Sequence, residues 1–147
     1  MEEEEINYRF LRKIQQMEKQ SPKLSDMKNN FYKDISDHIK NLEERLKTEE
    51  NSQKEKIIKE EISDIKKIVL NIYEQREKKI LFSAITKARG GKPDIENMVE
   101  REKKFFNTIL EDINTHRSII LLGKKAEEEN KTEEKDQSKK KTNNRPI

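Results

Sequence analysis

Residues that could do acid–base or metal chemistry are sparse in this chain. His38 and His116 are the two histidines, and neither has a second histidine four residues away, the spacing with which a helix presents two ligands to zinc. Cysteine is absent, which excludes thiol catalysis, zinc–cysteine sites and disulfide scaffolds. We therefore expect no catalytic residue, no metal site and no cofactor, and interpret both histidines as surface or helix-boundary residues.

Carboxylates are abundant but occur in runs, at 2–5, 43–44 and 127–129. Such runs are typical of solvated helix faces and not of an acid and a base paired in a pocket. Gly90-Gly91 is followed by Lys92 but lacks the full phosphate-loop pattern, so these glycines are better explained as the end of a helix. We predict that the protein is not an enzyme.

A group of basic residues close to these glycines could contact phosphate. Lys87, Arg89 and Lys92 are near one another in the sequence, although Glu77 and Asp94 flank them. The whole chain has 33 Lys and Arg against 30 Asp and Glu, a formal net charge of +3. Interspersed charges of both signs give a weak general attraction to nucleic acid. A helical nucleic-acid-binding protein that uses the cluster at 78–92 is therefore the alternative function.

One arginine occupies a position where an apolar residue is expected. Arg76 lies in an apolar stripe between Ile72 and Ile80, so its guanidinium must be paired, reach solvent along its stem, or meet a partner subunit. Glu102 interrupts the stripe of the next helical segment. We predict a charge cluster of Arg76, Lys79 and Glu102 at a helix junction or subunit boundary, with a structural role. A short turn between the two segments would leave Arg76 roughly 9 Å out of register with Glu102 and Lys79 closer.

Four segments with helical spacing of apolar residues must position these side chains. The third segment would form a rod of about 57 Å if its 38 residues are one continuous helix, which is longer than its neighbours can cover. Its apolar surface is wide, so more than one neighbour should pack on it. The last segment should start at Pro93-Asp94 after a short loop and fold back antiparallel on the rod. The predicted helices are 2–19, about Ser25 to Asn51, Ser52 to Arg89, and 95–122.

Two adjacent aromatic pairs and one small residue are candidates for packing. On a helix the two rings of Phe31-Tyr32, or of Phe105-Phe106, point about 100° apart. One ring of each pair should therefore enter the core while the other is half covered. Ala84 would allow another backbone to come close.

The predicted class is all-α: an antiparallel helical bundle with one long central helix over residues 1–123. Residues 124–144 contain one apolar residue, Ala126, and cannot bury enough surface to offset their chain entropy. We expect 124–147 to be a flexible charged linker or tail, disordered or weakly helical, with more protein following naturally. No stretch is apolar enough to span a bilayer, and a soluble cytoplasmic protein is expected.

Apolar residues make up 30% of the chain, well below the roughly 45–50% of ordinary globular proteins. A monomer would therefore have a small core. Because the long third segment has more apolar surface than its own neighbours can bury, we expect partner subunits to complete the core.

A set of spaced residues has a familiar arrangement: Ser21-Pro22-Lys23-Leu24, Phe31-Tyr32, Arg76 with Lys79-Ile80, Ala84 and Ala88, Asn97-Met98, Glu102, and Phe105-Phe106. This pattern resembles the helical A domain of archaeal GINS subunits, in the class whose A domain comes first and whose small β-rich B domain follows a flexible linker. The similarity covers about Ser21 to Leu122. Its motifs are spaced helix residues without a catalytic signature.

The resemblance implies a non-enzymatic structural subunit of the tetrameric GINS complex, which supports DNA replication by bridging the MCM helicase and a RecJ-like protein. Partners would be the other GINS subunits, with weak or indirect DNA contact, no membrane, and a location in the cytoplasm near the nucleoid. The B domain of that class is absent from this sequence, so its contacts are not carried over. The family's charge positions between helices would be Arg76, Lys79 and Glu102, and its core and subunit packing would use Phe31, Tyr32, Phe105 and Phe106.

Overall fold

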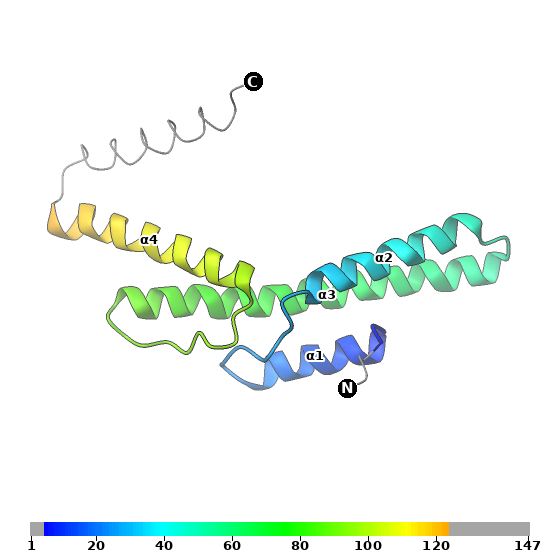
Figure 1. Cartoon of the computed structure of the whole chain (residues 1–147), viewed down its shortest axis with the longest axis horizontal. Coiled ribbons are helices and arrows are strands. Elements are labelled where there is room, and N and C mark those ends of the chain that lie inside the picture. The colour runs from blue at the N-terminus through cyan, green and yellow to red at the C-terminus, as the bar shows by residue number, and fades with distance from the viewer. Residues whose placement is uncertain (1–4, 124–147) are drawn as a thin grey trace, which may run out of the picture.

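The computed structural model describes residues 5–123, and four helices form the fold there (Figure 1). Within these residues there is no β-strand, so the all-α prediction is confirmed for the described part of the chain. The linker prediction for 124–147 lies outside the described residues. The helices are α1 Tyr8–Gln20, α2 Phe31–Thr48, α3 Ser52–Ala88 and α4 Glu100–Leu122.

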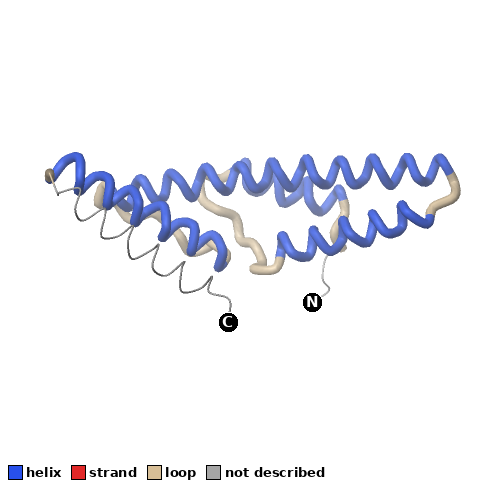
Figure 2. Tube along the Cα trace, turned by 90° about the horizontal axis from the view of Figure 1, so that it is seen from above, coloured by secondary structure: helices blue, strands red, loops and turns tan. Residues whose placement is uncertain are grey.

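Helix α3 is the spine of the molecule and runs without interruption for 37 residues, about 55 Å (Figure 2). The Asn51 side chain caps its start by accepting hydrogen bonds from the backbone N–H groups of Gln53 and Lys54. The helix ends before Gly90, whose φ of +91° favours glycine. A Cβ at Gly91 would lie 2.7 Å from Thr86 Cγ2, so a side chain there would require Thr86 to shift. The predicted long central helix and its glycine stop are confirmed, and its continuity, which the sequence left open, is settled by the structure.

The other three helices all pack on α3. Helix α2 lies along its N-terminal half and α4 along its C-terminal half, while α1 lies beside its middle (Figure 1). The prediction that more than one neighbour packs on the rod is therefore confirmed. This arrangement gives the chain two separate places in which to bury apolar side chains.

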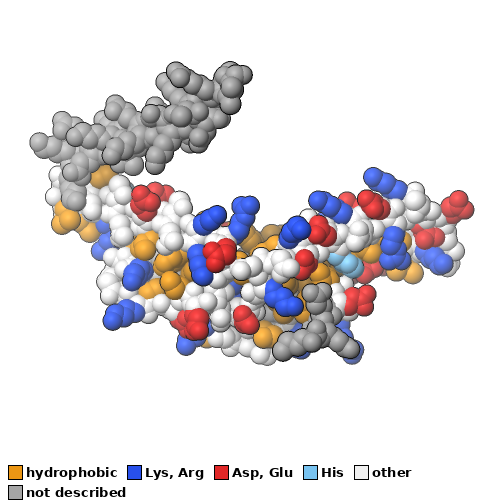
Figure 3. Space-filling model, viewed as in Figure 1, with side chains coloured by type: hydrophobic (Ala, Val, Ile, Leu, Met, Phe, Trp, Pro, Cys, Tyr) orange, Lys and Arg blue, Asp and Glu red, His pale blue; other side chains and the backbone are white. Residues whose placement is uncertain are grey.

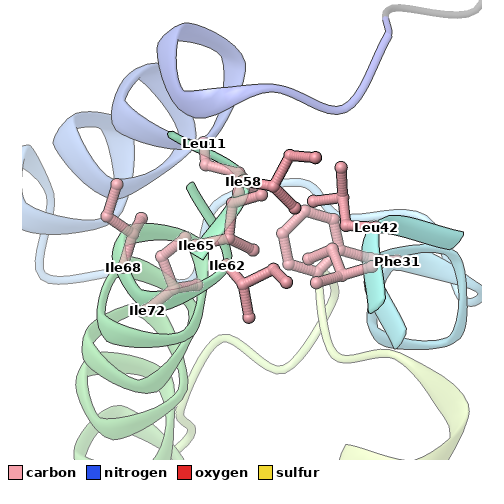
Figure 4. Packing of buried hydrophobic residues seen from close by; sticks show 9 residues of the cluster. Leu11, Phe31, Leu42, Ile58, Ile62, Ile65, Ile68 and Ile72 are labelled. Atoms are coloured by element: carbon pink, nitrogen blue, oxygen red, sulfur yellow. The ribbon is translucent and has the colours of Figure 1, made fainter. Parts of the chain in front are cut away.

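Two hydrophobic clusters fill these places. The first joins α1, α2 and the N-terminal half of α3, where Ile62 and Ile65 of α3 lie near Leu11 and Phe31 (Figure 4). The second joins the C-terminal half of α3, the start of α4 and the loops that precede α2 and α4. It contains Leu24, Ile80, Ala84, Met98 and Phe106.

Three predicted helix starts were wrong. Helix α1 begins at Tyr8, where the Asn7 side chain accepts the N–H of Phe10. Helix α2 begins at Phe31, because Ser25 binds α1 instead of capping a helix, and residues 21–30 are an irregular loop. Helix α4 begins at Glu100, so the connection 89–99 is long and not a short turn.

Charged side chains of both signs are interspersed on the face shown in Figure 3, as the near-neutral composition predicts. Among the described helices, none is long and apolar enough to cross a membrane.

Because Ile65 is fully buried at the centre of the first cluster, we expect Ile65→Ala to lower the free energy of unfolding by about 2–5 kcal/mol. Urea denaturation followed by circular dichroism measures this loss. The control is Ile57→Ala on the same helix, where Ile57 is 62% exposed and the loss should stay below about 1 kcal/mol. Equal losses in the two variants would contradict the packing described here.

Candidate functional site

The site with the strongest chemistry in the described chain is a buried charge network centred on Arg76. Arg76 is 0% exposed and lies one turn from Ile72, in the first cluster, and one turn from Ile80, in the second. The charge network lies between the two clusters, on the part of α3 that neither cluster covers. We call Glu18, Ser25, Arg76, Lys79, Asn97 and Glu102 the Arg76 network.

All five N–H donors of the Arg76 guanidinium are used. Nε and Nη2 donate to Oε2 and Oε1 of Glu102 at 2.8 and 2.7 Å, the two-pronged geometry that makes Arg–carboxylate pairs strong. Nη1 donates to Glu18 Oε1 at 2.7 Å and to the Ser25 carbonyl at 2.8 Å. Nη2 also donates to the Asn97 carbonyl at 2.9 Å. One side chain thus holds α1, both long loops and α4 against α3.

Glu18 is the second centre of the network and is also 0% exposed. Its carboxylate accepts hydrogen bonds from the Ser25 N–H at 3.1 Å, the Ser25 hydroxyl at 2.7 Å and Lys79 Nζ at 2.5 Å. Burial raises the pKa of Glu18, but the hydrogen bonds from Lys79, Ser25 and Arg76 and the charge of Arg76 outweigh it. The pKa of Glu18 is therefore lowered below its ordinary value, and Glu18 stays ionised.

Glu102 has two tasks at once. Besides binding Arg76, its Oε1 accepts the backbone N–H of Val99 at 3.1 Å, which caps the start of α4. Burial lowers the pKa of Arg76, but hydrogen bonds to Glu102 and Glu18 and their charges more than compensate, so its pKa is raised. The same carboxylate therefore fixes both the start of α4 and its position along α3.

The sequence-based register of this cluster was wrong. A short turn predicted Lys79 as the closer partner of Glu102, whereas Arg76 binds Glu102 directly and Lys79 binds Glu18. The connection 89–99 is long enough to run back along α3 before α4 begins, which brings Glu102 level with Arg76. Helix α4 therefore runs parallel to α3, and the prediction that it folds back antiparallel on the rod was wrong (Figure 1).

Glu18 was missed by the sequence analysis, although a signal existed. Leu11, Gln15 and Glu18 are the buried residues of α1 and are spaced by four and three residues, so they share one face of the helix. An ionisable residue on the same face as the most buried leucine of a helix indicates an ion pair in the interior.

The candidate packing residues are divided between the inside and the surface of the chain. Phe31, Ala84 and Phe106 are buried in its own clusters. Phe105 is 38% exposed, and Tyr32 is partly buried with its ring edge-on to Phe31 at a centroid distance of 5.2 Å. Burial raises the pKa of Tyr32, and its hydroxyl has no hydrogen-bond partner among the described residues.

The basic candidates are all outside the network. Lys87, Arg89 and Lys92 are exposed around the C-terminal end of α3, where they neither contact Arg76 nor enter a cluster. His38 and His116 lie on α2 and α4. Within residues 5–123, no group of three or more His, Asp or Glu side chains is placed to hold a metal ion.

No protein-family model and no curated protein matches this chain. The site is therefore interpreted from its own geometry. Because the charges of the Arg76 network are paired with one another and enclosed, that geometry is suited to holding helices in register.

Replacing Arg76 with methionine should lower the free energy of unfolding by about 3–5 kcal/mol, because Glu18 and Glu102 would stay in the interior without the guanidinium that pairs with both of them. Chemical denaturation of Arg76→Met and of the matched exposed control Lys78→Met measures the difference. A loss below about 1 kcal/mol in Arg76→Met would contradict a structural role for the network.

The lowered pKa of Glu18 predicts loss of stability in acid. Because the unfolded chain binds this proton more readily, the stabilisation is complete above the ordinary value of 4.5 and is lost as the pH falls through the lower folded-state pKa. We expect the stability difference between the natural chain and Glu18→Gln to be constant near neutral pH and to shrink below 4.5. Urea titrations at a series of pH values measure it, with exposed Glu44→Gln as control; a difference that persists at the acid end would disagree with this prediction.

Proposed function

We propose that the chain is a non-enzymatic structural subunit of the GINS complex, which supports DNA replication by bridging the MCM helicase and a RecJ-like partner. Its resemblance to the helical A domain over about Ser21 to Leu122 suggests the family. The observation that carries the proposal is an apolar face left exposed on a rod that is held rigidly by the Arg76 network.

The exposed face lies on the central and C-terminal parts of α3. Leu70, Tyr73 and Leu81 are 56%, 46% and 38% exposed, and at 100° per residue their side chains fall within about 80° of one another. Phe105 of α4 adds a further exposed ring. Exposed apolar side chains grouped on one face are typical of surfaces that bind another protein.

The residues proposed here for the subunit interface differ in part from those that the sequence suggests. Phe31, Arg76, Ala84 and Phe106 are enclosed by their own chain, so their role is to hold the helices together. Contact with sister subunits is proposed instead for Leu70, Tyr73, Leu81 and Phe105, with Tyr32 beside Tyr73 at a ring distance of 6.4 Å.

The mechanical contribution of such a subunit would be a rigid frame for its partners. A helix of 37 residues braced by three others holds its exposed face in a fixed direction, so partners bound along it keep fixed relative positions. A bridging role requires this property and needs no reactive group. The alternative, nucleic-acid binding through Lys87, Arg89 and Lys92, stays a prediction.

We expect the full chain of 17.6 kDa to assemble into larger species, alone or with the other GINS subunits of the same genome. The double variant Leu70→Glu/Leu81→Glu should weaken assembly by about tenfold or more, because charge enters an apolar contact. Size-exclusion chromatography with light scattering measures the assembled mass.

The matched control is Tyr8→Glu/Ile57→Glu, which adds the same charge at two residues of similar exposure away from the α3 face. Circular dichroism must show that both variants remain folded. The proposal would be overturned if the chain stayed monomeric at every concentration tested and also in the presence of the sister subunits.

A further inference from the structure

We infer that the groove between α1 and α2 is a docking site for a basic amphipathic helix of a partner protein. The inference goes beyond the proposed assembly, because the groove shares no residue with the exposed face of α3. We call it the α1–α2 groove: a hollow of about 740 Å³ bounded by α1, the loop 21–30 and α2.

The floor of the groove is apolar. Phe10, Ile14 and Met17 line it from α1 with the spacing i, i+4, i+7, and Met27 and Phe31 line it from the loop and α2. Met17 is 42% exposed although it faces the groove. Figure 3 shows hydrophobic side chains reaching the surface in the region between α1 and α2. The groove therefore offers apolar area that the chain does not cover with its described residues.

The shape of the groove favours a helix over an extended strand. Its walls are two helices whose backbone N–H and C=O groups are bonded within each helix, so an incoming strand would find no ladder partners. A helix satisfies its own backbone and needs side-chain contacts alone. Both α1 and α2 pack on α3 but make little contact with each other, so a further helix between them would complete a bundle.

The charge of the rim selects a basic occupant. Four carboxylates line the groove against two lysines. Glu5, Asp26 and Asp34 form no ion pair with another described residue, and Asp37 makes a long exposed contact of 3.9 Å with Lys33. Lysines or arginines beside the apolar anchors of a helix would meet these carboxylates at the edge of the contact, where charge sets partner choice and association rate.

His38 supplies an independent sign that the groove is incomplete. Its side chain lines the groove on α2, and its Nε2 is buried without a hydrogen-bond partner in the described chain. A buried polar atom without a partner has lost its hydrogen bonds to water and gained none in the protein, which is unfavourable. A polar side chain on a docked helix would remove this penalty.

A designed peptide tests the inference with the full 147-residue chain. The probe is a helix of about 14 residues, roughly 21 Å long, with leucine at i, i+4 and i+7 and lysines on both flanks. Its controls are a scrambled peptide of the same composition and a version with glutamate for lysine. Fluorescence anisotropy gives the affinity, and amide chemical shifts locate the site.

We expect the lysine peptide to bind, with amide shifts at Met17, Met27 and His38, and both control peptides to bind at least about tenfold more weakly. Asp34→Lys/Asp37→Lys in the protein should weaken the lysine peptide by a similar factor. The matched reversal Glu111→Lys/Asp112→Lys, on an exposed part of α4, should change affinity less than about twofold.

Several outcomes would overturn the inference. They are equal binding of the three peptides, shifts confined to the face of Leu70 and Leu81, or no binding at millimolar concentration. Groove shifts that appear with rising protein concentration and without peptide would assign the groove to a second copy of this chain. Groove residues that respond to no peptide but contact 124–147 in the free chain would assign it to the chain's own end.

Discussion

The fold depends on one guanidinium whose five donors are all bound. Arg76 is the side chain that bonds α1, both loops and α4 to the middle of α3 through Glu18, Ser25, Asn97 and Glu102. Lys79 adds bonds to Glu18 and to the Lys23 carbonyl, on α1 and the loop that follows it. An arginine suits this position better than a lysine. Its flat fork binds Glu102 with two parallel hydrogen bonds and still has donors for three other groups.

A buried charge network of this kind fixes one arrangement of the helices more than it stabilises the fold. Taking two carboxylates, an arginine and most of a lysine out of water is unfavourable, and their attraction roughly offsets that cost when every hydrogen bond is made. An apolar side chain in place of Arg76 would fill the space but would not distinguish one register of α4 from a register shifted by a turn. Because the chain has few apolar residues, the packing of its two small clusters leaves other helix registers close in energy. A contact that forms in only one register therefore matters more for the fold.

The sequence predicted the parts of this structure that depend on local patterns. The helical spacing of the apolar residues in α3 and its glycine stop follow from residue types within a few positions, and these predictions agree with the structure. Two of the three wrong helix starts, those of α2 and α4, share one cause. Ser25 and Pro93-Asp94 have the chemistry of helix starts, but tertiary bonds from Arg76 to the Ser25 and Asn97 carbonyls hold the surrounding residues as loops. No local rule contains that information. The partners of Glu18 were hidden for the same reason: its place on the face of Leu11 follows from local spacing, but Arg76 and Lys79 are 58 and 61 positions away.

The network also fixes how the two proposed contact surfaces are related. Glu18 is the neighbour in sequence of Met17, which lines the α1–α2 groove, and Arg76 lies one turn from Tyr73 on the exposed face of α3. The ion pair Glu18–Arg76 therefore connects the helix that lines one surface to the helix that carries the other through one buried hydrogen bond of 2.7 Å. Side chains so enclosed have few alternative rotamers, so the direction of α1 relative to α3 is set by the same contacts that set the position of α4. A partner helix in the groove and a sister subunit on α3 would then bind to a frame whose geometry is determined before either arrives, which lowers the ordering entropy lost on binding.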